Sequence, residues 1–381
     1  MSVNGKSLLF KTLQHQPTTA VPWVPFAGVH AGKLLGYDAT TVLTDGEKLL
    51  QSLLEVNRLY DPDGQPVLFD LQIEAEILGC DLVWAEEAPP SVSSHPLAGD
   101  HKTLPNALPN PDDGRLPMIL DVMRRMKAAV GEKTALYGLI TGPFTLASHL
   151  RGTDIFLDTV DDPGFLHDLV HYCTEVAQRM ADLYLEAGMD VIAVVDPVTS
   201  QISPRTFKSF LLEPFTGLFT HIRQQSAFSA FFVCGDATKN IEVMCQTGPD
   251  GIAVDENIDM VAIKPITDRY NLVLQGNIPL TTRMLLGTQQ DNMKYVVDLL
   301  DALPNHDNLI ISPGCDMPYA TPIENVIATV EAIRGPKNTR QILAHYQAAQ
   351  IDLDSIHLPD YANLKTPDRK STRLNSSHRI R

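Results

Sequence analysis

Two cysteines at the ends of apolar runs are the residues of this sequence best suited to bind a metal ion. Cys234 ends the run 230–234 and precedes Gly235, and Cys315 follows the run 308–311 after a Ser-Pro-Gly break. Each apolar run predicts a buried strand, and glycine or proline ends it. Both thiols are therefore expected at the carboxyl ends of strands. Thiolates with one or two oxygen or nitrogen donors are ligands of catalytic Zn²⁺. The two cysteines therefore predict a zinc site, provided that their strands share one edge.

Acidic, amide and hydroxyl residues, and one glycine, follow several of the other strands that the sequence predicts. These strand-end residues are Asp70, Thr141, Gly142, Asp196, Asp255, Glu256, Asn277 and Asp316. A single acid after a strand is more often a helix cap, and a lone cysteine is more often a small buried apolar residue. Acids and thiols are costly to gather without a ligand, so their recurrence at strand ends favours a functional site.

Strands and helices that would position these residues alternate along the chain. The expected strands are residues 21–26, 67–70, 80–84, 135–140, 191–195, 230–234, 251–254, 271–274 and 308–311. The expected helices are residues 7–15, 46–60, 73–78, 117–130, 163–187, 203–224, 238–245, 260–269, 290–303 and 322–333, with a capping helix at 338–350. This alternation without a linker predicts an α/β fold, a single-domain (β/α)8 TIM barrel over residues 1–350. A doubly wound sheet is less favoured, because no Gly-x-Gly-x-x-Gly follows a strand.

Length and composition exclude several classes of protein. The chain has 381 residues and a net charge of −16, which speaks against nucleic acid as a ligand. It contains no apolar window long enough to cross a bilayer and no signal-peptide core near its start, so we expect no membrane partner. Five scattered cysteines argue against a disulfide framework and predict a reducing, cytoplasmic location. Residues 89–117, rich in Pro, Ser, Asn and Asp, predict a long loop that is either functional or disordered.

The end of the chain differs in composition from the rest. Residues 368–381 carry five of the thirty Lys and Arg residues and a single acid. The run 368–378 resembles the translation of a sequencing adapter, so we expect residues 368–381 to be a non-native or disordered tail. Residues 351–367 are expected to be a C-terminal extension of the barrel. A genomic clone that encodes the same tail would contradict the adapter origin.

Short motifs spread over residues 5–335 carry a resemblance to a known family. They are Glu-Ala-Glu-x-x-Gly-Cys at 74–80, Gly-Pro-Phe-Thr at 142–145, Asp-Pro at 196–197, Cys-Gly at 234–235, Gly-Asn at 276–277 and Pro-Gly-Cys at 313–315. Together they resemble the uroporphyrinogen decarboxylase superfamily, and most of all its methylcobamide:coenzyme M methyltransferases and related corrinoid-dependent methyltransferases. True decarboxylases carry an arginine-rich element near the N-terminus, and residues 26–32 contain no arginine here.

The resemblance implies a zinc site built on Cys234 and Cys315. The family's motif is His-x-Cys-Gly, and Phe232 stands in this chain where the histidine is expected. A third ligand must therefore come from elsewhere. The candidates are Glu256, which we place first, and Asp255, Glu74, Glu76 and His30. The zinc would bind and deprotonate a substrate thiol whose sulfur exchanges a methyl group with cobalt.

The resemblance also implies a partner that supplies the cobamide. No Asp-x-His-x-x-Gly motif, which would ligate cobalt, occurs in the sequence. The leading prediction is therefore methyl transfer between a corrinoid carrier protein and a small methyl donor or thiol acceptor, with residues 89–117 as part of the docking surface.

Two alternatives to methyl transfer are kept. One is a decarboxylase or lyase in which the carboxylates at the strand ends do acid–base work, and the other is a barrel that only binds a tetrapyrrole or a protein partner. The assigned catalytic residues are Asp70, Asp196 and Asp255, and the assigned substrate-binding residues are Glu74, Glu76 and Asn277.

Overall fold

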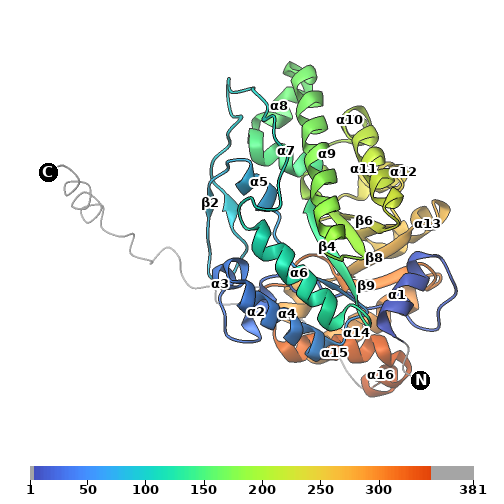
Figure 1. Cartoon of the computed structure of the whole chain (residues 1–381). Coiled ribbons are helices and arrows are strands. Elements are labelled where there is room, and N and C mark those ends of the chain that lie inside the picture. Colours follow the sequence, from blue (N-terminus) through green and yellow to red (C-terminus); the bar gives the residue numbers. More distant parts are fainter. Residues whose placement is uncertain (1–3, 345–381) are drawn as a thin grey trace, which may run out of the picture. The chain divides into compact units, whose positions relative to one another are not determined.

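Seven parallel strands form one curled sheet in the computed structural model, which describes residues 4–344 (Figure 1). Their order in the sheet is β1-β4-β5-β6-β7-β8-β9. The strands are β1 (Gly64–Pro66), β4 (Ala135–Thr141), β5 (Val191–Val195), β6 (Phe228–Val233), β7 (Gly251–Val254), β8 (Val273–Ile278) and β9 (Leu309–Pro313). The predicted extension 351–367 and the tail 368–381 lie outside the described residues.

The segment around Trp23 joins the two edges of this sheet. Trp23 forms a parallel bridge with Ile311 of β9, and the N–H of Val24 donates to the carbonyl of Ile311 at 3.0 Å. On its other side, the carbonyl of Trp23 accepts the N–H groups of Asp63 and Gly64 at 3.0 and 3.3 Å, where β1 begins. Eight extended segments therefore close into a ring, and the predicted (β/α)8 barrel is confirmed.

Helices follow the strands and cover the outside of the ring (Figure 1). They include α1 (Gly5–Leu13), α4 (Gly46–Tyr60), α6 (Leu116–Val130), α9 (Pro163–Glu186), α10 (Pro204–Phe210), α11 (Leu212–Gln224), α12 (Ile241–Gln246), α13 (Met260–Arg269), α14 (Gln289–Ala302), α15 (Ile323–Arg334) and α16 (Pro336–Leu343). Helix α4 has the predicted bounds, because Asp45 caps it through the N–H groups of Glu47 and Lys48 and because Leu49, Leu50 and Leu53 are buried. Between residues 4 and 344, we find no helix with both the length and the apolar composition that a bilayer crossing requires.

Each strand is buried on both of its faces. Val191, Ala193 and Val195 of β5 belong to the cluster inside the ring, whereas Ile192 and Val194 belong to the cluster between the sheet and the helices. This division follows from the two-residue period of a strand. It also explains why the strands are continuous apolar runs that sequence analysis can find.

Two predicted strands are placed differently in the structure. The strand expected at 67–70 is β1 at Gly64–Pro66, because its backbone pairs there with Ala135–Tyr137 of β4. The piece expected at 80–84 stays outside the barrel, where β2 (Leu82–Val83) pairs antiparallel with β3 (Ser91–Val92). The first half of the predicted 89–117 loop therefore contains a short strand.

Several short helices lie in the connections after strands and were not predicted. They are α2 (His30–Lys33), α3 (Ala39–Thr44), α7 (Pro143–Arg151) and α8 (Asp154–Asp161), whereas α5 (Ile73–Ile77) was expected. The predicted helix 203–224 is divided at Leu211 into α10 and α11, and the predicted helix 238–245 begins as a 3-10 turn at Thr238–Asn240. These elements build the walls above the strand ends.

Candidate active site at the barrel mouth

Cys234 and Cys315 meet over the carboxyl end of the ring. They follow β6 and β9, which β7 and β8 separate in the sheet, and their thiols are close enough to share a hydrogen bond. Both side chains are half-buried and pack on the cluster inside the barrel. The hydrogen bond with Cys315 and burial raise the pKa of the Cys234 thiol well above its usual range. A bound cation would reverse that shift, because it favours the thiolate.

An aromatic floor lies beneath this thiol pair. Phe232 is fully buried and stacks on Phe26 with 4.7 Å between ring centroids. Its ring also meets Phe69 edge-on at 6.0 Å. Phe232 precedes Cys234 by two residues, so both side chains point to the same side of their strand. The resemblance predicts a histidine at this position. The ring of Phe232 has no lone pair and therefore cannot bind a metal ion there.

Among the described residues, no third metal ligand joins the thiol pair. Across residues 4–344, no three His, Cys, Asp or Glu side chains are arranged so that they could hold a metal ion. Glu256, our first candidate, accepts the N–H of Leu280 at 2.6 Å, and burial raises its pKa. His30 uses both ring nitrogens, with the Tyr60 hydroxyl at 2.7 Å and the Tyr319 carbonyl at 3.1 Å. Burial also lowers the pKa of His30 to about 4.

Asp196, after β5, caps the helix that follows β4. Its carboxylate accepts the N–H of Phe144 at 2.9 Å and both the N–H and the hydroxyl of Thr145 at 3.1 and 2.6 Å. A Cβ atom on Gly142 would lie 2.3 Å from the Cβ of Asp196, so this close approach requires glycine. Burial raises the pKa of Asp196 to about 7, although these hydrogen bonds oppose the shift. The carboxylate is therefore fully engaged in fixing α7.

Asp70 and Glu76 share one arginine at the mouth. Arg115 donates to Asp70 at 2.7 Å and to Glu76 at 2.7 Å, and its guanidinium lies 5.0 Å from the ring centroid of Trp84. The Asp70 side chain has no exposed area, and the N–H of Gln72 donates to it at 2.9 Å. Sequence analysis missed Arg115 because it lies within the long stretch 89–117, which has no periodicity.

The remaining predicted substrate residues are also held by neighbours. Glu74 is buried and accepts the N–H and the hydroxyl of Thr141 at 2.9 and 2.7 Å, while burial raises its pKa. The amide of Asn277 donates to the carbonyls of Asp255 and Ile258 at 2.9 and 2.6 Å. These contacts tie the loop after β7 to β8 and fix the shape of the mouth.

Two acids act electrostatically on the Cys234 thiol. Asp255 and Asp316 both add to the upward shift of the Cys234 pKa. Asp255 accepts from Asn257, whose N–H lies at 2.9 Å. Burial raises the pKa of Asp316 to about 8, and the N–H of Gly28 donates to it at 2.7 Å. Asp316 can therefore hold a proton at neutral pH, and its place next to Cys315 was the sequence signal for it.

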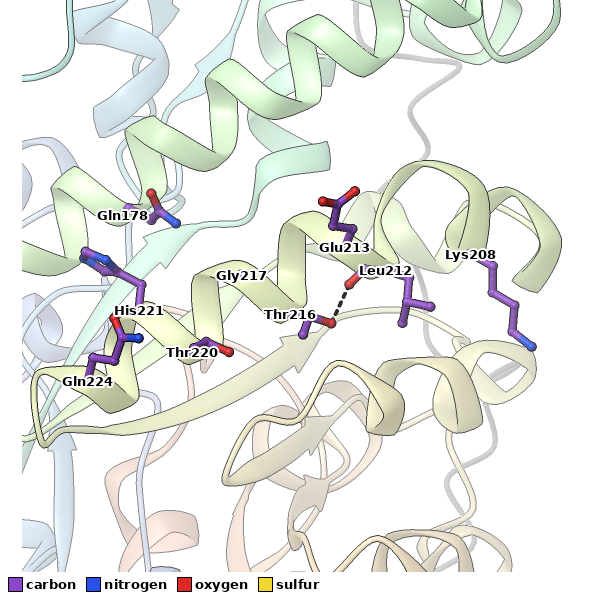
Figure 2. Close-up of a pocket in the computed structure, with 9 residues that line it drawn as sticks. All are labelled: Gln178, Lys208, Leu212, Glu213, Thr216, Gly217, Thr220, His221 and Gln224. Carbon is purple, nitrogen blue, oxygen red and sulfur yellow. Dashed lines mark hydrogen bonds between the residues drawn. The ribbon is translucent and has the colours of Figure 1, made fainter.

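A separate hollow lies on the outer helices and is not part of the mouth. It has a volume of about 670 Å³ and is lined by residues of α9, α10 and α11. Figure 2 shows Gln178 of α9 on one side of it, and His221 and Gln224 of α11 on the other. His221 is bound to Asp182 at 2.7 Å. The hollow contains none of the predicted site residues.

By its fold this protein is a (β/α)8 barrel. Two thiols and several buried carboxyl groups lie at the mouth of the barrel. The chain belongs to the uroporphyrinogen decarboxylase (URO-D) family, whose sequence profile matches residues 4–335. The family prediction is therefore confirmed over nearly all of the described residues.

Two relatives and one solved structure are similar to this chain over most of its length. Methylcobamide:CoM methyltransferase MtbA of Methanosarcina acetivorans is 26% identical over 341 residues, which are 87% of this chain and 98% of the relative. Methylcobamide:CoM methyltransferase MtaA of Methanosarcina barkeri is 30% identical over 271 residues, 69% of this chain and 76% of the relative. A methyltransferase from Methanosarcina mazei superposes with a TM-score of 0.79 at 24% identity, covering 87% of this chain and 99% of that one. The last comparison supports the fold.

Proposed function

We propose that this protein is a corrinoid-dependent methyltransferase that moves a methyl group between a cobamide carrier protein and a small substrate. The observation that carries the proposal is the thiol pair of Cys234 and Cys315, which two separate strands bring together at the mouth of the barrel. Relatives that align with most of the chain are named methylcobamide:CoM methyltransferases, which supports the same reaction class.

The thiol pair is proposed to bind Zn²⁺ together with Glu256. The fit is partial, because the two sulfur ligands are adjacent whereas Glu256 is held by Leu280. Zinc, when bound, would lower the pKa of a substrate thiol so that its sulfur is a nucleophile at neutral pH. The chain's own part is to hold the two sulfurs over an apolar floor, where Phe26, Phe69 and Phe232 exclude water from the reacting groups.

The roles proposed for the carboxyl groups differ according to their partners. Asp70, Asp196 and Asp255 were assigned as catalytic, and that assignment remains a prediction. The hydrogen bonds of Asp70 with Arg115, and of Asp196 with Thr145, favour positioning roles for these two residues. Asp255 acts electrostatically on the Cys234 thiol and is our candidate for proton transfer. Glu74, Glu76 and Asn277 are proposed to shape the substrate pocket through the loops that they fix.

The corrinoid carrier protein is proposed to dock over the mouth. The stretch 89–117 is the longest predicted loop and contains Arg115, which contacts Asp70 at the rim. This connection supports its assignment to the docking surface. A decarboxylase is the alternative activity, and it would need cationic side chains for the substrate carboxylates. Arg115 is already paired with Asp70 and Glu76, which disfavours that alternative.

Methyl transfer from methylcobalamin to a thiol tests the proposal directly. Purified protein is incubated with methylcobalamin and coenzyme M, and loss of the methyl–cobalt absorbance is followed. We expect turnover by the natural sequence and a loss of about 100-fold or more in Cys234→Ser and Cys315→Ser, since each removes a group at the reacting centre. Cys173→Ser is the matched control, because Cys173 is buried within α9. Full activity in both mouth variants would overturn the proposal.

A further inference from the structure

The thiol pair at the mouth differs from the other cysteines of the chain in its exposure. Cys234 and Cys315 are half-buried, whereas Cys80, Cys173 and Cys245 are buried. A small oxidant in solution can therefore reach the two mouth thiols more easily than the other three. We propose that Cys234 and Cys315 form a modification site, at which a hydroperoxide converts the two thiols into a reversible disulfide.

The closeness of the two thiols supports the formation of a disulfide. The cysteines follow two different strands, β6 and β9, and their thiols are close enough to share a hydrogen bond. Both side chains also pack on the same cluster inside the barrel. A disulfide places the two Cβ atoms about 4 Å apart, so two cysteines whose thiols already interact need only a small movement.

The backbone on either side of the cysteines allows such a movement. β6 ends at Val233 and the following 3-10 turn begins at Thr238, so Cys234 lies in irregular backbone between two elements. Gly235, which follows it directly, has a φ of +88°, a conformation that glycine adopts at little cost. Cys315 likewise lies outside its strand, because β9 ends two residues before it. A rotation at either cysteine therefore leaves the pairing of the strands unchanged.

The surroundings of the pair favour a reaction between the two sulfurs. The aromatic floor beneath them contains no nucleophile, since Phe232 stacks there on Phe26. Across residues 4–344, no three His, Cys, Asp or Glu side chains are arranged so that they could hold a metal ion, and Glu256 accepts the N–H of Leu280. A sulfenic acid that forms on one sulfur therefore has the other thiol as its neighbouring nucleophile.

The reaction consumes one hydroperoxide for each thiol pair. The thiolate of one cysteine attacks the terminal oxygen, the O–O bond breaks, and the departing alkoxide or hydroxide takes up the proton that this thiol has lost. The sulfur of the second cysteine then attacks the resulting sulfenic acid, which forms the S–S bond and releases water that carries the second thiol proton. The two sulfurs are each oxidised by one electron, and the peroxide is reduced by two.

The consequence for methyl transfer rests on the proposed function. Zinc binds the thiolate form of cysteine, and a disulfide sulfur has no such negative charge. The oxidised protein is therefore expected to lose the zinc proposed for this site, and reduction of the disulfide should restore zinc binding. Disulfides of this kind in a reducing compartment are usually transient and report oxidation.

Peptide mass spectrometry of the full chain tests the modification itself. Protein that has been reduced and treated with EDTA is exposed to hydrogen peroxide, and the remaining thiols are alkylated after denaturation. We expect a linked pair of peptides containing Cys234 and Cys315, which is lighter than the two reduced peptides by two hydrogen atoms and is absent after treatment with dithiothreitol. The two mouth thiols should be lost at least about tenfold faster than the three buried ones.

Two variants serve as controls for this link. Cys173→Ser should form it as the natural sequence does, because Cys173 is buried within α9. Cys234→Ser leaves Cys315 without its partner, so peroxide should convert Cys315 into a sulfinic acid that dithiothreitol does not reduce.

Four results would overturn the proposal. They are unreacted mouth thiols in the natural sequence, equal oxidation of all five cysteines, a link between a different pair, and sulfinic acid at both mouth positions in place of the disulfide. The link is measured without zinc, cobamide or methyl transfer. It can therefore be found when the proposed function fails, and it can be missing when methyl transfer is observed.

Discussion

The carboxylates after β1 and β5 and the thiols after β6 and β9 occupy equivalent places in the barrel but have different surroundings. Asp70 and Asp196 accept hydrogen bonds from Arg115 and Thr145 and from nearby backbone N–H groups. The thiols of Cys234 and Cys315 interact with each other and lie over an aromatic floor. A position at a strand end therefore identifies a residue of the barrel mouth. The hydrogen-bond partners of that residue then distinguish a group that stabilises the scaffold from a group that remains available to a ligand.

Removing the Asp196 carboxylate should have the largest effect on stability. Asp196→Ala leaves the start of α7 uncapped and deprives Thr145 of its acceptor, so we expect the free energy of unfolding to fall by about 3 kcal/mol. Urea unfolding followed by circular dichroism measures this. Cys234→Ser should change it by less than about 1 kcal/mol. An equal decrease in the free energy of unfolding for Asp196→Ala and Cys234→Ser would contradict the distinction between groups that stabilise the scaffold and groups that react.

Breaking the Arg115 pairs should have the next largest effect. Arg115→Met removes a hydrogen-bond donor from the buried Asp70 carboxylate, which keeps the N–H of Gln72, and we expect a loss of about 2 kcal/mol. The matched control is Arg125→Met, since Arg125 pairs with Glu47 on the exposed surface and is expected to contribute less than about 1 kcal/mol. A larger effect at Arg125 than at Arg115 would contradict the assignment of Asp70 to the scaffold.

The titration of Asp196 should give a smaller, pH-dependent effect. Burial raises its pKa in the folded protein to about 7, above the value of about 3.9 in an unfolded chain. The folded state therefore binds the extra proton, and the resulting stability is complete below about pH 4 and is lost as the pH rises through 7. Between those values the unfolding free energy should fall by up to about 1.4 kcal/mol per pH unit through this group. Unfolding at pH 5, 6 and 7 should show a shallower slope in Asp196→Asn, and identical slopes would contradict this account.

The sequence predicts well those elements whose bounds follow from a local pattern of residues. It predicts poorly those elements whose bounds depend on contacts with distant parts of the chain. The bounds of β5 and β7 were predicted to the residue, because each is a buried apolar run that polar or glycine residues interrupt. β1 was misplaced because Gly64–Pro66 is less apolar than the residues after it, and only pairing with β4 selects it.

The site shows the same division between local and distant information. The barrel fold allowed the prediction that Cys234 and Cys315 could face one another, and the family's motif showed that Phe232 takes the place of a histidine. Neither rule gives the path of the loop that brings Arg115 to Asp70, or the partners that occupy His30.

The zinc content of the purified full chain tests the central claim most directly. We predict about one zinc ion per chain by elemental analysis after dialysis, and its loss in both Cys234→Ser and Cys315→Ser, while Cys173→Ser retains it. The control variant separates the mouth thiols from a general effect of losing a cysteine. A well-folded natural protein that binds no zinc when zinc is supplied, or mouth variants that keep it, would contradict the role assigned to the thiol pair.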